Sequence, residues 1–422
     1  MIAVLRRRDF VLLWFGGLIS MGGSWVLSIA LPFYVYDLTG STLATSAAYM
    51  ANMLPSFLLG SVAGVFADRW DRKRIMVVAD LSRALVLLLL LLVRSEEWLW
   101  LVYIVILLET TLSTFFGPAE NALLPRLVGE EHLVAANSLN ALNNNIARLV
   151  GPPLGGALFG LLGLPAVVLI DSASYLLSAI LIGLISSAPY GKQEDGPEAG
   201  TAAVSAWVGV WRDWTAGLTL VKGDAFVASL FMVTGMSMLA DGLFNALTVP
   251  FVDEVLRAEP VFFGWWAMAQ GIGGLLGGVV VGSVGRLLSP ARLLGLSLGW
   301  GGAIILVIVH LASVQLTLAL TILLGVLVTG RAVGQGTLMQ SSVPDRYRGR
   351  IAGASDTTNG VLRLMGLGLS GALADRVGLL PMLNAAGITY SFAGLLALVL
   401  LRRGSKKREA EDSIGREARS AP

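Results

Sequence analysis

Apolar runs follow one another along almost the whole of this 422-residue chain, and each is about 20 residues long. A helix of that length spans the hydrocarbon core of a bilayer. Only 14% of the residues are charged, against about 25% in soluble domains. The runs lack the alternation of apolar and polar residues that is typical of a membrane β-strand. The sequence therefore predicts an all-α integral membrane protein.

We expect twelve transmembrane helices. They are predicted at residues 10–36, 43–66, 75–93, 98–120, 136–163, 165–187, 225–251, 262–284, 291–311, 314–340, 351–377 and 379–401. An even count places both ends of the chain on one side. Basic residues crowd the loops on that side, whereas the other side carries only Arg94, Arg257 and Arg376. The positive-inside rule then predicts a multi-pass protein of the inner (cytoplasmic) membrane with both termini in the cytoplasm.

One long polar break divides the chain. We expect an N-terminal six-helix bundle at 1–187, a cytoplasmic linker at 188–222, a C-terminal six-helix bundle at 223–402 and a disordered cytoplasmic tail at 403–422. The second part of the linker has an apolar stripe at spacings of four and three. It consists of Trp207, Trp211, Trp214, Leu218 and Val221. Such a stripe favours a helix that lies in the membrane interface.

The two halves are related in sequence. Four elements recur at an offset of 215: Asn144, Arg148, Gly151 and the Gly-Ala-Leu of 156–158 become Asn359, Arg363, Gly366 and the Gly-Ala-Leu of 371–373. A duplicated six-helix unit in the same orientation implies two bundles related by an axis along the membrane normal. That is the architecture of a transporter that rocks around a central site.

Small residues at helical spacing predict close helix packing. Glycines four apart occur at Gly60/Gly64, Gly151/Gly155 and Gly274/Gly278/Gly282. After the first pair, Asp68 continues the same helix face, and the basic residues Arg69 and Arg72 follow. We expect Asp68 to meet the positive N-terminal end of the eleventh span, near 349–353, when the cytoplasmic side is closed. Gly64, Asp68, Arg69 and Arg72 would then form a conformational latch, with plain inside-positive anchoring as the alternative.

Two motifs carry a resemblance to the major facilitator superfamily over nearly the whole chain. The loop between spans two and three resembles G-x-x-x-D-R-x-G-R-[KR], with Asp71 where the family has glycine. The "GPPLGG" of span five, which contains Gly151, Pro152, Gly155 and Gly156, resembles the motif of antiporter-type exporters, although Ala147 replaces an upstream glycine of its longer form. The chain looks most like the branch with macrolide-efflux and siderophore-export proteins. The resemblance implies proton-coupled antiport.

Ionisable residues inside apolar runs cost roughly 2.5–3.5 kcal/mol each on insertion scales, so each is a functional candidate. Glu109 lies in the middle of span four beside Thr110 and Ser113. Asp241 in span seven and Asp171 in span six are further candidates for carrying a proton. For Asp171, a hydrogen-bonded packing role is an equal alternative.

Polar stripes on spans five and eleven form a second group. Asn144 and Arg148 on one, and Asn359 and Arg363 on the other, lie at helical spacing. We interpret them, together with Arg331 in span ten, as inter-helix hydrogen-bonding groups near a cytoplasmic gate. Direct contact with substrate is the alternative.

Three functions were compared. The first is secondary active export of a lipophilic or amphipathic molecule by alternating access, in exchange for protons or Na⁺. The second is import or facilitated diffusion of a polar metabolite on the same fold. The third, a membrane enzyme, has little support, because no Walker or HExxH pattern occurs. We expect no cofactor, no metal site and no nucleic-acid partner; the expected partners are a small-molecule substrate and the lipid bilayer, and the protein is expected to be a monomer.

Overall fold

The computed structural model describes residues 2–186, 199–285, 287–311, 313–343 and 345–401. Within these ranges all regular structure is helical, in agreement with the all-α prediction. Contacts divide the chain into two compact units. Unit 1 contains Met1–Val210 and Val252–Met268, and unit 2 contains Trp211–Phe251 and Ala269–Pro422. Each unit is described separately.

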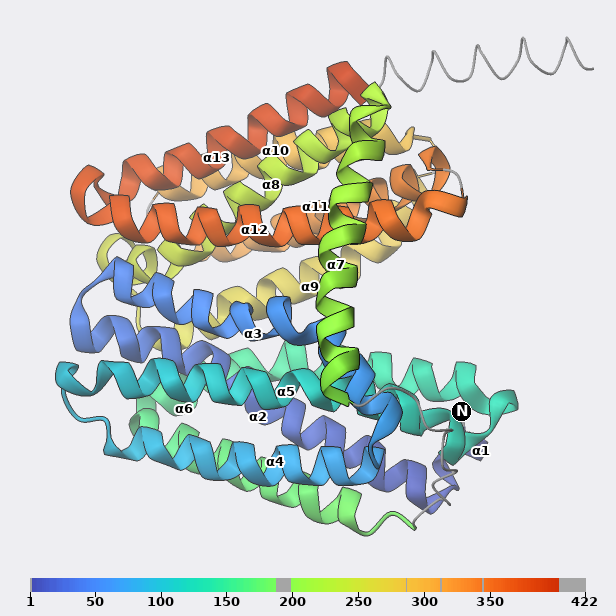
Figure 1. Ribbon diagram of the computed structural model, residues 1–422. Coiled ribbons are helices and arrows are strands. Elements are labelled where there is room, and N and C mark those ends of the chain that lie inside the picture. Colours follow the sequence, from blue (N-terminus) through green and yellow to red (C-terminus); the bar gives the residue numbers. More distant parts are fainter. Residues whose placement is uncertain (1, 187–198, 286, 312, 344, 402–422) are drawn as a thin grey trace, which may run out of the picture. The chain divides into compact units, whose positions relative to one another are not determined.

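Unit 1 is a bundle of long, roughly antiparallel helices (Figure 1). Its elements are α1 (Ile2–Leu5), α2 (Arg8–Thr39), α3 (Thr42–Arg69), α4 (Arg72–Leu88) with η1 (Leu89–Leu92), η2 (Glu96–Trp98), α5 (Leu99–Val128), η3 (Glu130–His132) and α6 (Leu133–Gly183). α2 packs along α6, α3 packs on α5, and α4 lies against both α5 and α6. These contacts bring the middles of α2, α4, α5 and α6 together.

α6 consists of two arms rather than one rod. Gly163 has φ +73° and ψ −179°, which breaks the helix between residues 162 and 164. A positive φ is readily adopted by glycine, and Pro165 follows where a new helix can begin. The two arms correspond to the spans predicted at 136–163 and 165–187.

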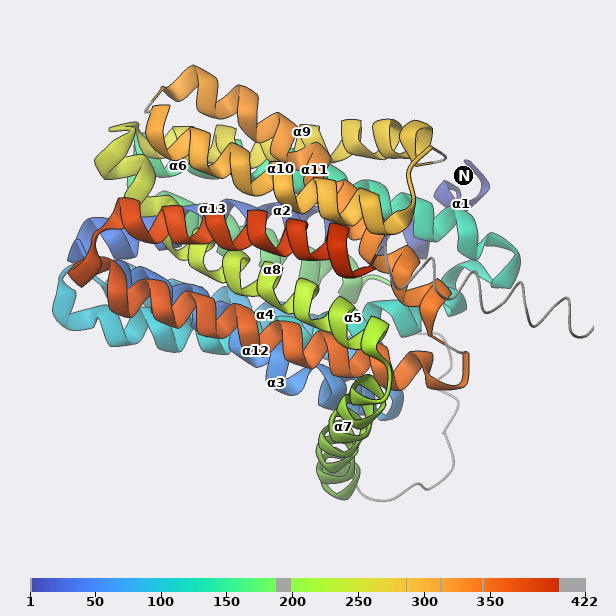
Figure 2. The same cartoon turned by 90° about the horizontal axis from the view of Figure 1, so that it is seen from above.

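Unit 2 repeats the bundle plan (Figure 2). Its helices are α8 (Ala225–Pro250), which continues into η4 (Phe251–Val255), the larger part of α9 (Pro260–Val284), α10 (Pro290–Leu311), α11 (Val314–Ser342), α12 (Asp345–Val377) and α13 (Leu379–Leu396) with η5 (Ala397–Leu401). α12 and α13 pack on α8, and α10 packs between α11 and α13.

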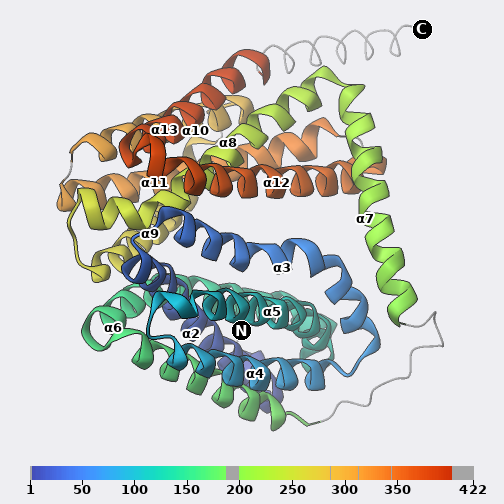
Figure 3. The same cartoon turned by 60° about the vertical axis from the view of Figure 1, so that its left-hand side comes forward.

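The predicted interfacial helix is present as α7 (Ala199–Lys222), the long green helix in Figure 3. Trp214 donates a hydrogen bond from Nε1 to Thr358 Oγ1 at 3.2 Å. Val221 is buried beside Ile351, and Leu218 packs on the same cluster. Trp211 is 63% exposed, and the side chain of Trp207 lies outside the described part of the chain. A location in the membrane interface stays a prediction.

Nine helices within the described ranges are long and apolar enough to cross a membrane. They include α6, which supplies two arms. The predicted spans at 43–66 and 351–377 coincide with α3 and α12, which have 28 and 33 residues but are not among the nine. Every predicted span thus coincides with a helix or an arm of α6, while membrane crossing by α3 and α12 stays a prediction.

Close glycine packing occurs at some of the predicted positions and is absent at others. A Cβ added at Gly155 would overlap the Val26 backbone of α2, and one at Gly151 would overlap Trp25. By contrast, a Cβ at Gly60, Gly64, Gly278 or Gly282 would meet no atom within 4 Å. In α9, Gly274 does lie against α11, where Thr329 Oγ1 donates to its carbonyl at 3.1 Å, but the predicted register fails at Gly278 and Gly282. Gly273 and Gly277 make the close approach, to Ile322 and Thr329 of α11, because they face that helix.

Candidate functional site

A buried arginine organises the centre of unit 1. Arg83 lies on α4, eleven residues after the helix begins at Arg72, or about 16 Å along the axis. Its relative exposure is 5%. A guanidinium removed from water needs anionic partners. Arg83 was not among the sequence-predicted candidates, whereas its principal partner was.

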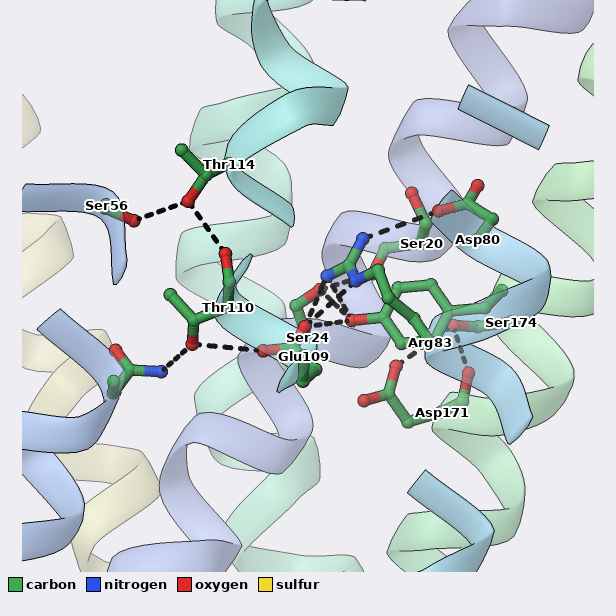
Figure 4. Close-up of polar contacts among 12 residues, drawn as sticks. Ser20, Ser24, Ser56, Asp80, Arg83, Glu109, Thr110, Thr114, Asp171 and Ser174 are labelled. Carbon is green, nitrogen blue, oxygen red and sulfur yellow. Dashed lines mark hydrogen bonds and ion pairs between the residues drawn. The ribbon is translucent and has the colours of Figure 1, made fainter. Parts of the chain in front are cut away.

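That partner is Glu109 of α5. Arg83 donates to Glu109 Oε1 from Nε at 3.0 Å and from Nη2 at 2.6 Å (Figure 4). The side chains are only 6% and 13% exposed. Glu109 therefore lies near the middle of its predicted span, as expected. Its carboxylate forms a charge-assisted hydrogen bond with Arg83.

Tyr175 of α6 connects α2, α4 and α5. Tyr175 Oη donates to Glu109 Oε1 at 3.0 Å, shares a 2.8 Å hydrogen bond with Ser24 Oγ and accepts from Arg83 Nη2. The Arg83 Cζ atom also lies 3.9 Å from the centre of the Tyr175 ring. Tyr175 is fully buried, so its hydroxyl must find partners inside the protein.

Two more carboxyl groups surround the arginine. Asp80 is fully buried, and its Oδ1 lies 3.4 Å from Arg83 Nη1. Asp171, also fully buried, accepts from Ser174 Oγ at 3.1 Å. The Oδ2 atoms of Asp80 and Asp171 have no hydrogen-bond partner. Gly23 makes room for Asp171, because a Cβ there would overlap its carboxyl group. The cluster thus holds three carboxyls for one guanidinium.

A cavity of about 360 Å³ opens beside this cluster. Trp25, Leu31, Leu87 and Ile106 supply apolar wall, and the polar wall includes Ser24, Ser28, Asn52, Ser56, Arg83, Glu109, Thr110 and Ser113. Asn52 Nδ2 donates to Thr110 Oγ1 at 3.4 Å, and Thr110 Oγ1 lies 3.4 Å from Glu109 Oε2. Glu109, Thr110 and Ser113 all line this cavity.

Unit 2 contains a related trio. Arg331 of α11 donates from Nη1 to Asp241 Oδ2 of α8 at 2.7 Å, and Tyr390 of α13 donates to Asp241 Oδ1. Tyr390 follows Tyr175 by 215 positions, the offset of the sequence repeat. Here one carboxylate faces one guanidinium, so this trio is charge-balanced. Asp241 and Arg331, predicted separately, are brought together.

The exporter-like motif is used for packing. Gly151 and Gly155 bring the first arm of α6 against α2, as described above. Gly156 faces the start of α9, where an added Cβ would lie 2.9 Å from the Pro260 oxygen. Pro152 is buried on the same arm. Its role in antiport stays a prediction.

The structure describes the side chains of some residues of the predicted latch. Gly64 has open space beside it, and Arg72 Nε donates to the Ala67 carbonyl at 3.4 Å. Arg69 lies in the last turn of α3, and the side chain of Asp68 is outside the described part of the structure. Asp71, which replaces the family's glycine, caps α4 by accepting from Arg74 N at 2.9 Å. The latch stays a prediction.

The polar stripes face outward from their own units. Asn144 and Arg148 are exposed on α6, and Arg363 is exposed on α12. Asn144 Nδ2 donates to the Asn140 carbonyl at 3.1 Å, and Asn359 Nδ2 donates to Ser355 Oγ at 3.3 Å. Their assignment to a gate stays a prediction.

Two repeated bundles of membrane-length helices are the architecture of many membrane transporters. Among the described residues, no three His, Asp or Glu side chains are placed to hold a metal ion. The model of the transmembrane secretion effector family matches residues 1–421, and the chain belongs to this family. It is a transporter of the major facilitator type.

Relatives agree with this assignment. The chain is 28% identical over 398 residues to the MFS-type transporter YfiS of Bacillus subtilis, and the alignment covers 90% of each chain. It is 26% identical to macrolide efflux protein A of Streptococcus pyogenes, over 88% of this chain and 91% of the relative. It is also 26% identical to the multidrug efflux pump Tap of Mycolicibacterium fortuitum, over 94% of this chain and 97% of the relative.

The fold is shared with solved structures. A bacterial homologue of the iron transporter ferroportin, in an inward-facing state, aligns with a TM-score of 0.72 and 19% identity, over 94% of this chain and 98% of the other. At that identity the likeness concerns the fold alone.

Proposed function

We propose that the protein is a proton-coupled antiporter that exports lipophilic or amphipathic small molecules by alternating access. The observation that carries this proposal is the charge balance in unit 1, where Asp80, Glu109 and Asp171 share Arg83 as their cation. Burying a carboxylate that has no counter-charge is costly, and binding a proton removes that cost. A cluster with surplus carboxyls is therefore suited to carry protons.

Proton binding at Glu109 would act on its ion pair. A neutral carboxyl attracts the guanidinium less strongly, so Arg83 would shift toward Asp80, which lies one turn earlier on α4 and already contacts it. The cavity wall would change in charge at the same step, because Glu109 and Arg83 both line it. Substrate and proton would then favour different states, as coupling requires. Asp241 is the second coupling candidate.

The cavity also supports the class of substrate. Its Trp25, Leu31 and Leu87 surfaces suit an apolar body, while its hydroxyls, Asn52 and Glu109 suit a few polar or cationic groups. Macrolides combine these features, and a relative is named for macrolide efflux. In this proposal the protein works as a monomer in the inner membrane with both termini in the cytoplasm.

Purified protein in liposomes tests the proposal. With an imposed pH gradient, the wild type should accumulate labelled erythromycin against its concentration gradient, and a protonophore should abolish the accumulation. Glu109→Gln should lose accumulation but still exchange labelled for unlabelled erythromycin, because a neutral side chain of equal size preserves the cavity. Glu97→Gln, at an exposed position on η2, is the matched control.

Two results would contradict the proposal. Full accumulation by Glu109→Gln would reject the coupling assignment. If the wild type moved neither erythromycin nor the cationic dye ethidium in any of these assays, the proposed substrate class would be wrong.

A further inference from the structure

Glu120 is a second carboxyl of α5 that neither the cavity nor the arginine cluster uses. It follows Glu109 by eleven residues, or three helical turns, so both side chains leave the same face of α5. Its Oε1 accepts a hydrogen bond from Asn140 Nδ2 of α6 at 3.2 Å. On α2, the side of Gly17 faces the same oxygen, 3.7 Å from the position of an added Cβ.

Helix register places Glu120 level with Asp80. Asp80 lies eight residues after the start of α4 at Arg72, and Glu120 lies eight residues before the end of α5 at Val128. These two helix ends are at the same end of unit 1, and the helices pack together. Both carboxyls are therefore about 12 Å from that end. Asp80 is also a charged group whose field acts on Glu120.

Asn140 connects Glu120 to an exposed polar face. The Asn140 carbonyl accepts from Asn144 Nδ2 at 3.1 Å, and Asn137 and Asn144 are both exposed on the first arm of α6. Exposed amide side chains inside a membrane helix line water rather than lipid. Glu120 is thus joined through Asn140 to this exposed polar face, and it lies level with Asp80, whose Oδ2 has no partner.

We infer that Glu120 is the residue through which protons enter and leave the central cluster of unit 1. A proton from water at the Asn137–Asn144 face binds to the Glu120 carboxylate, passes to Asp80 and then neutralises Glu109. Each step breaks one O–H bond and forms another, with no change of oxidation state. The inference rests on the proposed function, because it supplies the route that proton coupling needs.

The surroundings of Glu120 fit a relay. The helices packed around it present Gly17 from α2, Asp80 from α4 and Asn140 from α6. None of these is a cation, so no fixed ion pair holds the carboxylate charged. Arg83 is one turn deeper on α4 and is bound to Glu109. Glu120 can therefore exchange its proton without breaking the central ion pair.

A pH jump tests the relay without any substrate. Protein in liposomes is mixed rapidly from alkaline to acidic buffer, and infrared spectroscopy follows the carbonyl band of protonated carboxyl groups. In Glu120→Gln the central carboxyls should still become protonated, but about a hundredfold or more slowly, the lower end of what a positioned proton donor contributes. The glutamine keeps the hydrogen bond from Asn140 and the volume of the side chain.

Rescue distinguishes a relay from a structural role. Glu120→Asp, and formate added to Glu120→Ala, should restore the rate, because each supplies a carboxyl at the interrupted step and the alanine leaves room for the formate. Glu131→Gln, whose wild-type side chain is 74% exposed near the same end of unit 1, should match the wild type. An unchanged rate in Glu120→Gln, or a slow rate that neither Glu120→Asp nor formate restores, would overturn the inference. Failure of erythromycin transport alone would count against the proposed function and leave this result standing.

Discussion

Arg83 is the residue on which the central cluster depends. It is buried and bonded to Glu109, with Asp80 and Tyr175 as further partners. Removing one member of a buried ion pair costs about 3–5 kcal/mol, because the other charge stays buried without a partner. We therefore expect Arg83→Met to lower the free energy of unfolding in detergent by about that amount. Arg94→Met, at an exposed position, should change it little.

A double variant separates the ion pair from packing. Arg83→Met combined with Glu109→Gln should be less destabilised than the sum of the two single changes, because neither the Arg83 nor the Glu109 charge is then left facing the absence of the other. Strict additivity of the two changes would mean that the pair does not interact as described.

The hydroxyl group of Tyr175 contributes measurably to the free energy of unfolding. Tyr175→Phe removes the bonds to Ser24, Glu109 and Arg83, so the free energy of unfolding should fall by about 1–3 kcal/mol. In the Arg83→Met/Glu109→Gln background the same change should cost much less, as chemical denaturation of the four proteins would show. An equal cost in both backgrounds would place the hydroxyl outside the network.

The sequence predicted part of this site. Glu109 and Asp171 stand out because each is a single charge inside a long apolar run. Arg83 follows the basic residues Arg72, Lys73 and Arg74 by only nine to eleven positions, so its charge does not stand out in the sequence. Its partners are 26 and 92 residues away, and no local pattern encodes such contacts. The offset of 215 could have indicated Tyr175, since Tyr390 repeats it.

At the scale of the element, apolar length determined the helices, and glycine determined how closely they pack. Every predicted span coincides with a helix or an arm of α6. Which glycines face a neighbour was less predictable, because it depends on helix rotation. Gly273 and Gly277, rather than Gly278 and Gly282, contact the next helix.

Two glycines of one helix arm allow a matched test of this packing. Gly155→Ala would push a methyl group into the Val26 backbone, whereas Gly160→Ala points into open space. We expect Gly155→Ala to cost about 1–3 kcal/mol, the usual range for overpacking, and Gly160→Ala to be neutral. Thermal unfolding in detergent compares them, and equal melting temperatures would contradict the close contact of α6 with α2.

The linker helix α7 offers a second test at this scale. Trp214 packs in a cluster of unit 2 and bonds to Thr358, while Trp211 is 63% exposed. Trp214→Ala should therefore destabilise the protein by about 2 kcal/mol, roughly half the cost at a fully buried site. Trp211→Ala should have little effect on thermal unfolding. A larger effect of Trp211→Ala than of Trp214→Ala would mean that Trp211, rather than Trp214, packs against unit 2.

At the scale of the whole molecule, each unit has one arginine–carboxylate–tyrosine trio, and the two trios differ in charge balance, although only their tyrosines are related by the sequence repeat. The first has two further buried carboxyls and the second is neutral. The family model and the relatives establish a transporter. Two-state behaviour follows from the proposed latch at Asp68, which would favour the state closed to the cytoplasm.

The chain has no cysteine, so an introduced one can report this equilibrium. Asp68→Asn should raise the alkylation rate of a cysteine placed at Asn144, on the exposed face of α6, about tenfold for each 1.4 kcal/mol by which the latch favours closure. A cysteine at Ser95, in the loop between α4 and α5, should not become more reactive. No change at position 144 would reject the latch.

Proton movement driven by substrate is the most direct test of the account. Liposomes containing the protein and a pH-sensitive dye are given an outward erythromycin gradient with no initial pH gradient. The account predicts proton flux opposite to the erythromycin flux in the wild type, and none above background in Glu109→Gln, although that variant still exchanges erythromycin. Erythromycin flux without proton flux in the wild type, or equal proton flux in Glu109→Gln, would contradict it.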